Sequence, residues 1–372
     1  MPGNPEDLVA SHVRSSPTGE ELWSWVSENL RRFVPFDGAG WFGIDPSTLL
    51  ANCPIRVENI EQGHCESYWE RECKVDDVLL FRDLARAPVP VGTLYAATGN
   101  RPELSPRYRE YLAPQNFDDE LRATFRIGGK SWGAIDLYRQ RGRNRFDEKD
   151  VALVSRIGSA IAGALRGLAT QERSREATPP PEGIGTALFD HSGGLLSFDE
   201  QADRWFTEIG GPQWMERRPP SMSGVWATVF RAANVHIGRD RGPSTVRLRT
   251  KDRHWVTVSA SVLRSVGYAA GPGPVALSVS RSLGWDIAPL LADAFGLTPR
   301  EQEICEATAR GLSNQEIAAE VGLSAHTVRD HLKAVFAKMG VTSRGELVAR
   351  MFSDLYEPRI MAPGADVVHA YF

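Results

Sequence analysis

The sequence predicts a multidomain α+β chain that ends in an all-α domain of four short helices. The C-terminal stretch 297–351 is divided into helix-length pieces by Ser and Thr caps and by glycines. Upstream, apolar–polar alternation on both sides of a proline-rich break at 177–183 predicts β-strands, with helical patterns between them. The length of 372 residues suits two or three domains.

The N-terminal region, residues 15–170, is predicted to combine helices with an antiparallel sheet. Two alternating runs, 121–127 and 130–138, are joined by Gly128-Gly129, which is the pattern of a β-hairpin. Asp147 stands where it can cap a long helix. The elements in order are a helix at 18–35 with Leu22, Val26, Leu30 and Phe33 on one face, a strand at 38–45, a helix at 58–88, an extended segment at 93–98, a short helix at 105–114, the hairpin, and the long helix from 148 to 168.

A second α+β region is predicted at 184–282. Three consecutive prolines in the preceding segment, 171–183, form a stiff linker that cannot be helical. The elements are strands at 185–190 and 195–197, helices at 200–209 and 222–235, and strands at 244–250, 254–263 and 275–279. A further helix, Trp285–Phe295, lies in a segment at 283–296 that would couple this region to the C-terminal domain at 297–356. Residues 357–372 form a tail.

Capping patterns mark the helix boundaries of the C-terminal domain. A Ser or Thr followed three residues later by Glu can satisfy free backbone N–H groups at a helix start, and Gly readily ends a helix. The boxes are Thr298/Glu301 with Pro299 at the first helical position, Ser313/Glu316 and Ser343/Glu346; Ser324 caps the third helix with Thr327 at N3; and the stop glycines are Gly311, Gly322 and Gly340.

The tight turn at 321–324 between the second and third helices predicts a helix-turn-helix. The third helix has a predicted buried stripe of Val328, Leu332, Phe336 and Met339, an outward face of His326, Arg329, Asp330 and Lys333, and a flanking line of Thr327, His331, Ala334 and Lys338. From Ser324 to Arg344 four cations oppose one anion, which gives a charge of +3. Such a face suits the major groove of DNA, because phosphates attract the charge and the groove admits a helix.

This stretch resembles the DNA-binding domain of LuxR-type bacterial transcription regulators, the four-helix class shared with NarL-like response regulators. The match covers about a sixth of the chain. The matching residues are Leu297–Glu301, Gly311–Asn314, Glu316–Ala318, Ser324, Thr327, Val328, His331, Lys338–Val341, Ser343 and Arg344.

The resemblance implies a set of DNA-binding residues in and around the helix-turn-helix at 313–332. Base contacts would fall on Arg329, Asp330 and Lys333. Phosphate contacts would fall near Thr327, His331, Lys338 and Arg344. The remaining members of the set are Ser313, Asn314, Ser324 and Val328.

Asp330 departs from the family pattern, in which an uncharged residue is common at this position. Its carboxylate could accept a hydrogen bond from a cytosine amino group. Alternatively, it could pair with Arg329 or Lys333 on its own helix. The second alternative is favoured, because an acid cannot approach phosphates without cost.

The order of elements in 15–170 resembles a GAF domain. The residues that carry this resemblance run from Trp132-Gly133-Ala134 to Phe146-Asp147-Glu148-Lys149-Asp150. The resemblance implies a sensory and dimerisation domain that could hold a small-molecule effector. Strand, turn, strand, helices and a three-stranded meander at 184–282 resemble a PAS domain. Five aromatic residues could line an effector pocket, although a core role is expected for most of them: Trp41, Tyr68, Trp69, Phe81 and Trp132.

Composition and motifs exclude several other classes. The net charge of −4 means that any DNA-binding patch must be local. Cys53, Cys65, Cys73 and Cys305 match no zinc spacing, so buried neutral thiols are expected rather than a metal site or redox switch. GxSxG, Walker and HExxH motifs are missing from the sequence, so no catalytic residue, cofactor or metal is predicted. We expect no signal peptide and no apolar run long enough for a bilayer.

The sequence therefore predicts a cytoplasmic, dimeric transcription regulator that binds double-stranded DNA and is not an enzyme. RNA polymerase is a candidate partner, and no membrane association is expected. An alternative is an interaction module for ligands or proteins, in which the C-terminal helices mainly form a dimer. The two differ in whether binding depends on DNA sequence.

Overall fold

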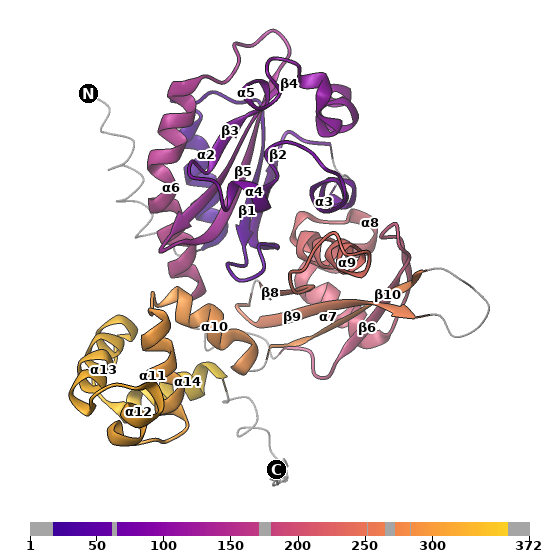
Figure 1. Ribbon diagram of the computed structural model, residues 1–372. Coiled ribbons are helices and arrows are strands. Elements are labelled where there is room, and N and C mark those ends of the chain that lie inside the picture. Colours follow the sequence, from indigo (N-terminus) through magenta and orange to yellow (C-terminus); the bar gives the residue numbers. More distant parts are fainter. Residues whose placement is uncertain are drawn as a thin grey trace. The chain divides into compact units, whose positions relative to one another are not determined.

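The structure of this chain is a computed structural model. It describes residues 18–61, 65–170, 180–250, 252–264, 272–282 and 284–355. The chain forms two compact units, the N-terminal unit at 1–281 and the C-terminal unit at 282–372 (Figure 1). The N-terminal unit holds two antiparallel five-stranded sheets, and the described part of the C-terminal unit is helical. The predicted combination of α+β structure with a helical C-terminal region is therefore confirmed.

The first sheet has the strand order β2-β1-β5-β4-β3. Its strands are β1 (Gly38–Ile44), β2 (Ala51–Glu58), β3 (Val91–Thr93), β4 (Phe117–Ile127) and β5 (Lys130–Gln140). The helical elements around it are α2 (Gly19–Leu30), α3 (Cys65–Lys74), α4 (Phe81–Leu84), α5 (Leu94–Ala97), η1 (Pro102–Leu104), η2 (Tyr108–Leu112), η3 (Ala113–Gln115) and α6 (Glu148–Ala169). We call this part the first sheet region.

The predicted hairpin is confirmed by β4 and β5, which pair from Phe117/Gln140 to Ile127/Lys130. Gly128 and Gly129 both have positive φ, at +60° and +77°. A two-residue turn with positive φ at both positions matches the twist of the flanking strands, and glycine adopts it without steric cost. The turn therefore fixes the register of the two central strands.

The long helix predicted after Asp147 is confirmed as α6. Asp147 and Asp150 form a capping box at its start. Its buried face, which includes Val154, Ile157 and Ile161, packs against β4 and β5. Among the described residues, α6 is long and apolar enough to cross a membrane by length and composition alone. This differs from the expected absence of such a run, but a core helix that packs on a sheet passes the same test.

The prediction of one helix over 58–88 is wrong. The structure has β2 through Glu58, then α3 and α4 with a loop between them. Asp77 explains the break, because its carboxylate accepts hydrogen bonds from the N–H groups of Val78 and Arg107 and from the hydroxyl of Ser105. These bonds anchor the loop to a segment that lies about thirty residues later in the chain.

Three smaller predictions also change. Most of the segment predicted to be extended at 93–98 is the short helix α5. The helix predicted at 105–114 is a π-helical turn followed by a 3-10 turn. Phe33, which was expected on the buried face of the first helix, lies beyond α2 and is 36% exposed, whereas Trp23 is fully buried.

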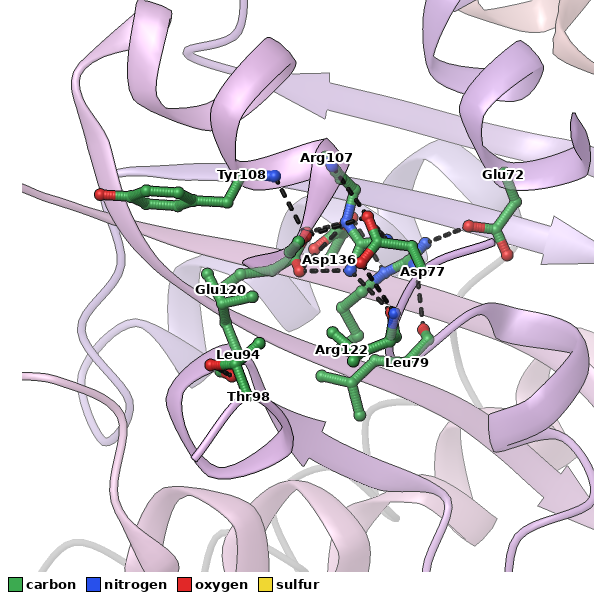
Figure 2. A network of polar contacts seen from close by, with 12 residues as sticks. Glu72, Asp77, Leu79, Leu94, Thr98, Arg107, Tyr108, Glu120, Arg122 and Asp136 are labelled. Atoms are coloured by element: carbon green, nitrogen blue, oxygen red, sulfur yellow. Dashed lines mark hydrogen bonds and ion pairs between the residues drawn. The ribbon is translucent and has the colours of Figure 1, made fainter. Parts of the chain in front are cut away.

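A network of buried charges lies within the first sheet region (Figure 2). Arg107 makes a two-point pair with Glu120, with Nε–Oε1 and Nη2–Oε2 distances of 2.9 and 2.7 Å. Arg122 lies 2.8 Å from Glu72 and 3.2 Å from Asp136. The arginine side chains are 4% and 0% exposed. Such charges remain buried only when they are paired.

Asp136 holds a proton more tightly than an ordinary aspartic acid. Burial raises the pKa of its carboxyl, and the negative charge of Glu120 raises it further. The guanidinium groups of Arg122 and Arg107 lower this pKa without cancelling the effect, so that it reaches about 8. The hydroxyl of Tyr68 lies 2.9 Å from Asp136 and 3.0 Å from Arg122, which joins the network to α3.

The second sheet region follows at 180–281 and has the strand order β7-β6-β10-β9-β8. Its strands are β6 (Gly185–Phe189), β7 (Leu195–Phe198), β8 (Thr245–Arg249), β9 (Trp255–Arg264) and β10 (Pro272–Arg281). Its helices are α7 (Glu200–Gly210), α8 (Trp214–Arg217), η4 (Pro220–Met222) and α9 (Ser223–His236). The predicted elements of 184–282 are confirmed, and α8 and η4 are additions. The linker segment 171–179 and Lys251 of the predicted turn lie outside the described residues.

Both sheets follow one plan. In each sheet, the first strand along the chain lies between the second and the fifth. The fifth strand also pairs with the fourth, and the fourth pairs with the third. The apolar–polar alternation of the sequence predicts strands but does not reveal this order. The structure therefore shows a repeat of topology that is not visible as a sequence repeat.

The two sheet regions share one hydrophobic core. Aromatic residues of the first region, such as Tyr68 and Trp69, belong to the same buried cluster as Phe189 and Trp226 of the second. A buried ion pair joins Asp45 to Arg247 at 3.0 Å. Burial raises the pKa of Asp45, although Arg247 and the backbone N–H groups that it accepts from act in the opposite direction.

The C-terminal unit contains α10 (Gly284–Ala294), α11 (Pro299–Ala309), α12 (Asn314–Val321), α13 (Ala325–Met339) and α14 (Arg344–Leu355). The helix predicted at Trp285–Phe295 is confirmed as α10, which packs against α14 within this unit. Its coupling role stays a prediction. Ile287 and Leu290 of α10 are buried. The guanidinium of Arg350 lies 5.3 Å from the ring centre of Phe295, just after α10.

Candidate nucleic-acid interface

Capping boxes set the helix starts of the C-terminal unit. Thr298 accepts a hydrogen bond from the N–H of Glu301, whose carboxylate accepts one from the N–H of Thr298. Ser313 and Glu316 make the same pair of bonds. These two predicted boxes are confirmed.

The third box is shifted by one residue. Ser343 accepts a hydrogen bond from the N–H of Glu346 at 3.1 Å, as predicted. The carboxylate of Glu346, however, accepts from the N–H and hydroxyl of Thr342 rather than from Ser343. A Thr immediately before the cap offers two donors, which explains the preference.

The predicted turn between the second and third helices is confirmed. Gly322 ends α12 in the left-handed conformation, with φ of +68°, and its N–H donates to the carbonyl of Ala318. Ser324 then caps α13 by accepting from the N–H of Thr327 at 3.1 Å. The helix ends at Gly340, which also has a left-handed backbone conformation.

The buried stripe of α13 differs from the prediction at one position. Val328, Leu332 and Met339 are buried as expected. Val335 is fully buried, whereas Phe336 is only partly buried at the edge of the same core. Both positions fit helical spacing, so periodicity alone does not choose between them.

The outward face of α13 carries the residues predicted for base contacts. His326, Arg329, Asp330 and Lys333 are all exposed. Within the described part of the C-terminal unit, Arg329 has no ion-pair or side-chain hydrogen-bond partner. Thr327 and His331 are partly exposed on the flank. The helix therefore presents two cations and one anion, with His326 counted as neutral.

Asp330 pairs along its own helix. Its carboxylate lies 3.6 Å from Nε2 of His326 and 3.8 Å from Nζ of Lys333. Arg329, the other predicted partner, does not take part. All three side chains are more than half exposed, so these pairs contribute little to stability. The alternative contact with a cytosine stays a prediction.

Lys338 is held by Glu301, an acid on another helix that no sequence pattern connects to it. Its Nζ lies 2.6 Å from Oε2 of Glu301, the same oxygen that accepts from the N–H of Thr298. The Glu301 side chain is 6% exposed. Burial by itself would raise the pKa of Glu301, but the hydrogen bonds from Lys338 and Thr298 outweigh burial and lower it. Lys338 therefore links α13 to the start of α11.

Arg344 also has a structural role. Its guanidinium donates to the backbone carbonyls of Thr308 and Leu312 near the end of α11 and to the side-chain oxygen of Asn314. A cation at a helix C-terminus satisfies carbonyls that have no partner within the helix. Arg344 thus joins the starts of α12 and α14. No sequence signal indicates this contact, because two of the three partners are backbone carbonyls and all lie about thirty or more residues earlier in the chain.

The Cys, His, Asp and Glu side chains of the described residues form neither a reactive thiol site nor a metal site. Burial raises the pKa of Cys53 and Cys305 to about 11 and that of Cys73 to about 12, so these thiols stay protonated at neutral pH. The side chain of Cys65 lies outside the described residues. No group of three or more His, Cys, Asp or Glu residues with metal-binding geometry occurs in the described ranges.

Known proteins resemble the segment whose geometry is described above. Residues 296–351 match the family model described as bacterial regulatory proteins, luxR family. This luxR-family segment contains α11, α12 and α13 and most of α14. The match agrees with the sequence-based resemblance over the same helices.

Two relatives of this chain are named as regulators. The transcriptional regulatory protein UhpA of Escherichia coli is 46% identical over 56 residues, which are 15% of this chain and 29% of that protein. The probable HTH-type transcriptional regulator GfsR of Streptomyces halstedii is 34% identical over 107 residues, which are 29% of this chain and 38% of that protein. The chain thus spans about a third of the length of these relatives.

Similarity to a solved structure adds little. The crystal structure of Escherichia coli SdiA aligns with 93% of this chain and 94% of its own, at 11% identity and a TM-score of 0.33. A likeness this weak supports no conclusion. The luxR-family segment is therefore the part of the chain that the comparisons identify.

Proposed function

We propose that this protein is a sequence-specific, DNA-binding transcription regulator in which α13 reads the major groove. The observation that carries the proposal is the capped helix-turn-helix of the luxR-family segment, with Arg329 and Lys333 exposed on α13. A major groove accepts a helix of this size, and cations on its outer face can reach base edges and phosphates. The proposal places the protein in the cytoplasm and gives it no catalytic role.

We further propose that the N-terminal unit is the sensory part. The first sheet region would be GAF-like over 15–170 and the second PAS-like over 184–282, with an effector shifting an existing equilibrium between active and inactive forms. The common strand order of the two sheets supports a pair of related sensory folds. Homodimerisation would place two α13 helices on two half-sites, and RNA polymerase would be the partner for activation.

The proposed phosphate contacts now divide into two groups. Thr327 and His331 lie on the exposed flank of α13. Lys338 and Arg344 are used within the fold, so any phosphate contact would be shared with Glu301 or with the carbonyls of Thr308 and Leu312. Ser313 and Ser324 act as caps, and the N–H groups near the starts of their helices would face phosphates.

The test is selection of DNA sites from a random pool with the full chain, followed by affinity measurement over a salt series. We expect one motif with two half-sites. Arg329→Ala and Lys333→Ala should each weaken binding to that motif by about 1–3 kcal/mol and relax base preference. The matched control is Arg241→Gln, which removes an exposed arginine outside the luxR-family segment. Failure to select any motif would exclude DNA reading and favour the interaction-module alternative.

A further inference from the structure

We infer that a cavity between the two sheet regions of the N-terminal unit binds a flat aromatic acid. The inference rests on the proposed function, because this compound would be the effector. The cavity has a volume of about 390 Å³, and its walls come from β1, β2, β5 and α3 on one side and from 217–223 on the other. This volume lies within the usual range for small-molecule sites.

Aromatic rings form much of the cavity wall. Phe42, Tyr68, Trp69, Tyr111 and Tyr138 all line it. Phe42 stacks on Tyr68 with ring centres 5.6 Å apart, and it meets Trp69 edge to face at 5.4 Å. These contacts fix the rings in place. A wall of fixed rings favours a flat ring system, which can stack on one ring and meet another at its edge. Of the five aromatic residues considered from sequence, Tyr68 and Trp69 line the cavity.

Two residues that line the cavity have a buried hydroxyl group without a partner. Tyr138, on β5, is 0% exposed, and Ser223, at the start of α9, is 1% exposed. Neither hydroxyl has a hydrogen-bond partner among the described residues. A buried polar atom without a partner is costly, so each hydroxyl is suited to a polar group on a ligand. The hydroxyl of Tyr68 differs, because Asp136 and Arg122 already satisfy it.

One cation on the cavity wall, Arg217, can receive an anion. Arg217 and Arg218 line the cavity, as does the acid Glu61. Arg218 lies 2.7 Å from Glu66, whereas exposed Arg217 has no ion-pair partner within the described ranges. A carboxylate on the ligand can therefore pair with Arg217 through a charge-assisted hydrogen bond. The ligand would touch both sheet regions at once, and its binding would stabilise their packing.

The test uses 6-hydroxy-2-naphthoate as the probe, with its uncharged amide as the matched ligand. Binding to the full chain is measured by calorimetry and by the melting temperature. The acid should bind and raise the melting temperature, and the amide should bind at least about 3-fold more weakly, since the ion pair at Arg217 is partly screened by solvent. Absence of acid binding at millimolar concentration overturns the inference.

Conservative variants locate the site. Tyr138→Phe and Ser223→Ala each remove one hydroxyl and should raise the Kd about 3- to 10-fold. Arg217→Gln should remove the difference between acid and amide. Tyr108→Phe, which removes a hydroxyl bonded to Asp118 outside the cavity, should leave the Kd unchanged. Equal effects in the Tyr138 and Tyr108 variants would overturn the assignment of the cavity.

DNA-site selection on the same preparations separates the two proposals. If the full chain selects a motif but does not bind the acid, the inference fails and the regulator function stands. If the acid binds with the expected variant pattern but no motif is selected, the inference about the cavity is supported and the proposed function fails.

Discussion

At the scale of single residues, two lysines of α13 have opposite roles. Lys333 is 72% exposed and pairs only loosely with Asp330, so its charge is available to a ligand. Lys338 is 34% exposed and is tied to Glu301, which is nearly buried. Charge counting in the sequence treats the two alike. Their contacts show that one can serve binding while the other stabilises the helices.

Lys338→Ala should destabilise the C-terminal unit by about 1–2 kcal/mol, because the nearly buried carboxylate of Glu301 would lose its charged partner and keep only its hydrogen bond from Thr298. Lys333→Ala, the matched control, should change the free energy of unfolding very little while weakening DNA binding. The measurement is urea unfolding of residues 282–372. Since the folded pKa of Glu301 is lowered, its contribution is present above the unfolded value of 4.5 and is lost as the pH falls through the folded pKa. Equal stability of the two variants would contradict this assignment.

Asp136→Asn should flatten the pH dependence of stability of the full chain. The pKa of Asp136 is raised from 3.8 to about 8, so the folded state binds one more proton than the unfolded state between these values. Stability therefore falls as the pH rises through this window, by about 1.4 kcal/mol per pH unit at most. Thermal unfolding from pH 5 to pH 8 measures the slope.

Asp83→Asn is the control for this experiment, because Asp83 is 62% exposed. It should leave the slope as it is in the unchanged protein. An unaltered slope in the Asp136 variant would show that this carboxyl does not hold the extra proton.

At the scale of elements, close packing joins the two sheet regions. Gly224, near the start of α9, lies where an added Cβ would be 2.7 Å from the carbonyl oxygen of Ala51 and 2.6 Å from Leu248. The glycine thus allows α9 to approach β2 and β8. Helix propensity alone would favour Ala at this position, so the contact explains the residue.

Gly224→Ala should destabilise the N-terminal unit by about 1–3 kcal/mol, because a backbone carbonyl cannot move aside as a flexible side chain can. Gly163→Ala is the matched control in α6, where the new Cβ would meet only Ile127 at 3.8 Å. It should stabilise the protein by about 0.5–1 kcal/mol. Thermal unfolding of both variants checks the prediction, and destabilisation of similar size in both would contradict it.

At the scale of the whole molecule, the proposed dimer makes a prediction about DNA spacing. Two α13 helices that read half-sites on one face of the duplex require a separation of about one helical turn, or 10 bp. Insertion of 5 bp between the selected half-sites should weaken binding by at least about tenfold, since it turns one half-site to the opposite face. Gel-shift titration measures the change. Equal affinity for both spacings would show that the two helices bind independently.

The sequence by itself determined the local features of this protein. Caps, stop glycines and helical periodicity predicted the helix-turn-helix, and alternation with Gly128-Gly129 predicted the central hairpin, because these signals depend on residues close together in the chain. It also placed Arg329 and Lys333 on the outer face of α13. The loop after α3 was missed because Asp77 finds its partners about thirty residues away.

Only the tertiary structure decided which residues meet across long distances in the sequence. It paired Lys338 with Glu301, placed Arg344 against the carbonyls of Thr308 and Leu312, and brought Tyr138 and Ser223 to one cavity. These contacts depend on strand order and on packing between elements, and neither leaves a periodic pattern in the chain. The sequence therefore identified the proposed DNA reader, while the cavity for a proposed effector became visible only when two distant parts of the N-terminal unit were packed together.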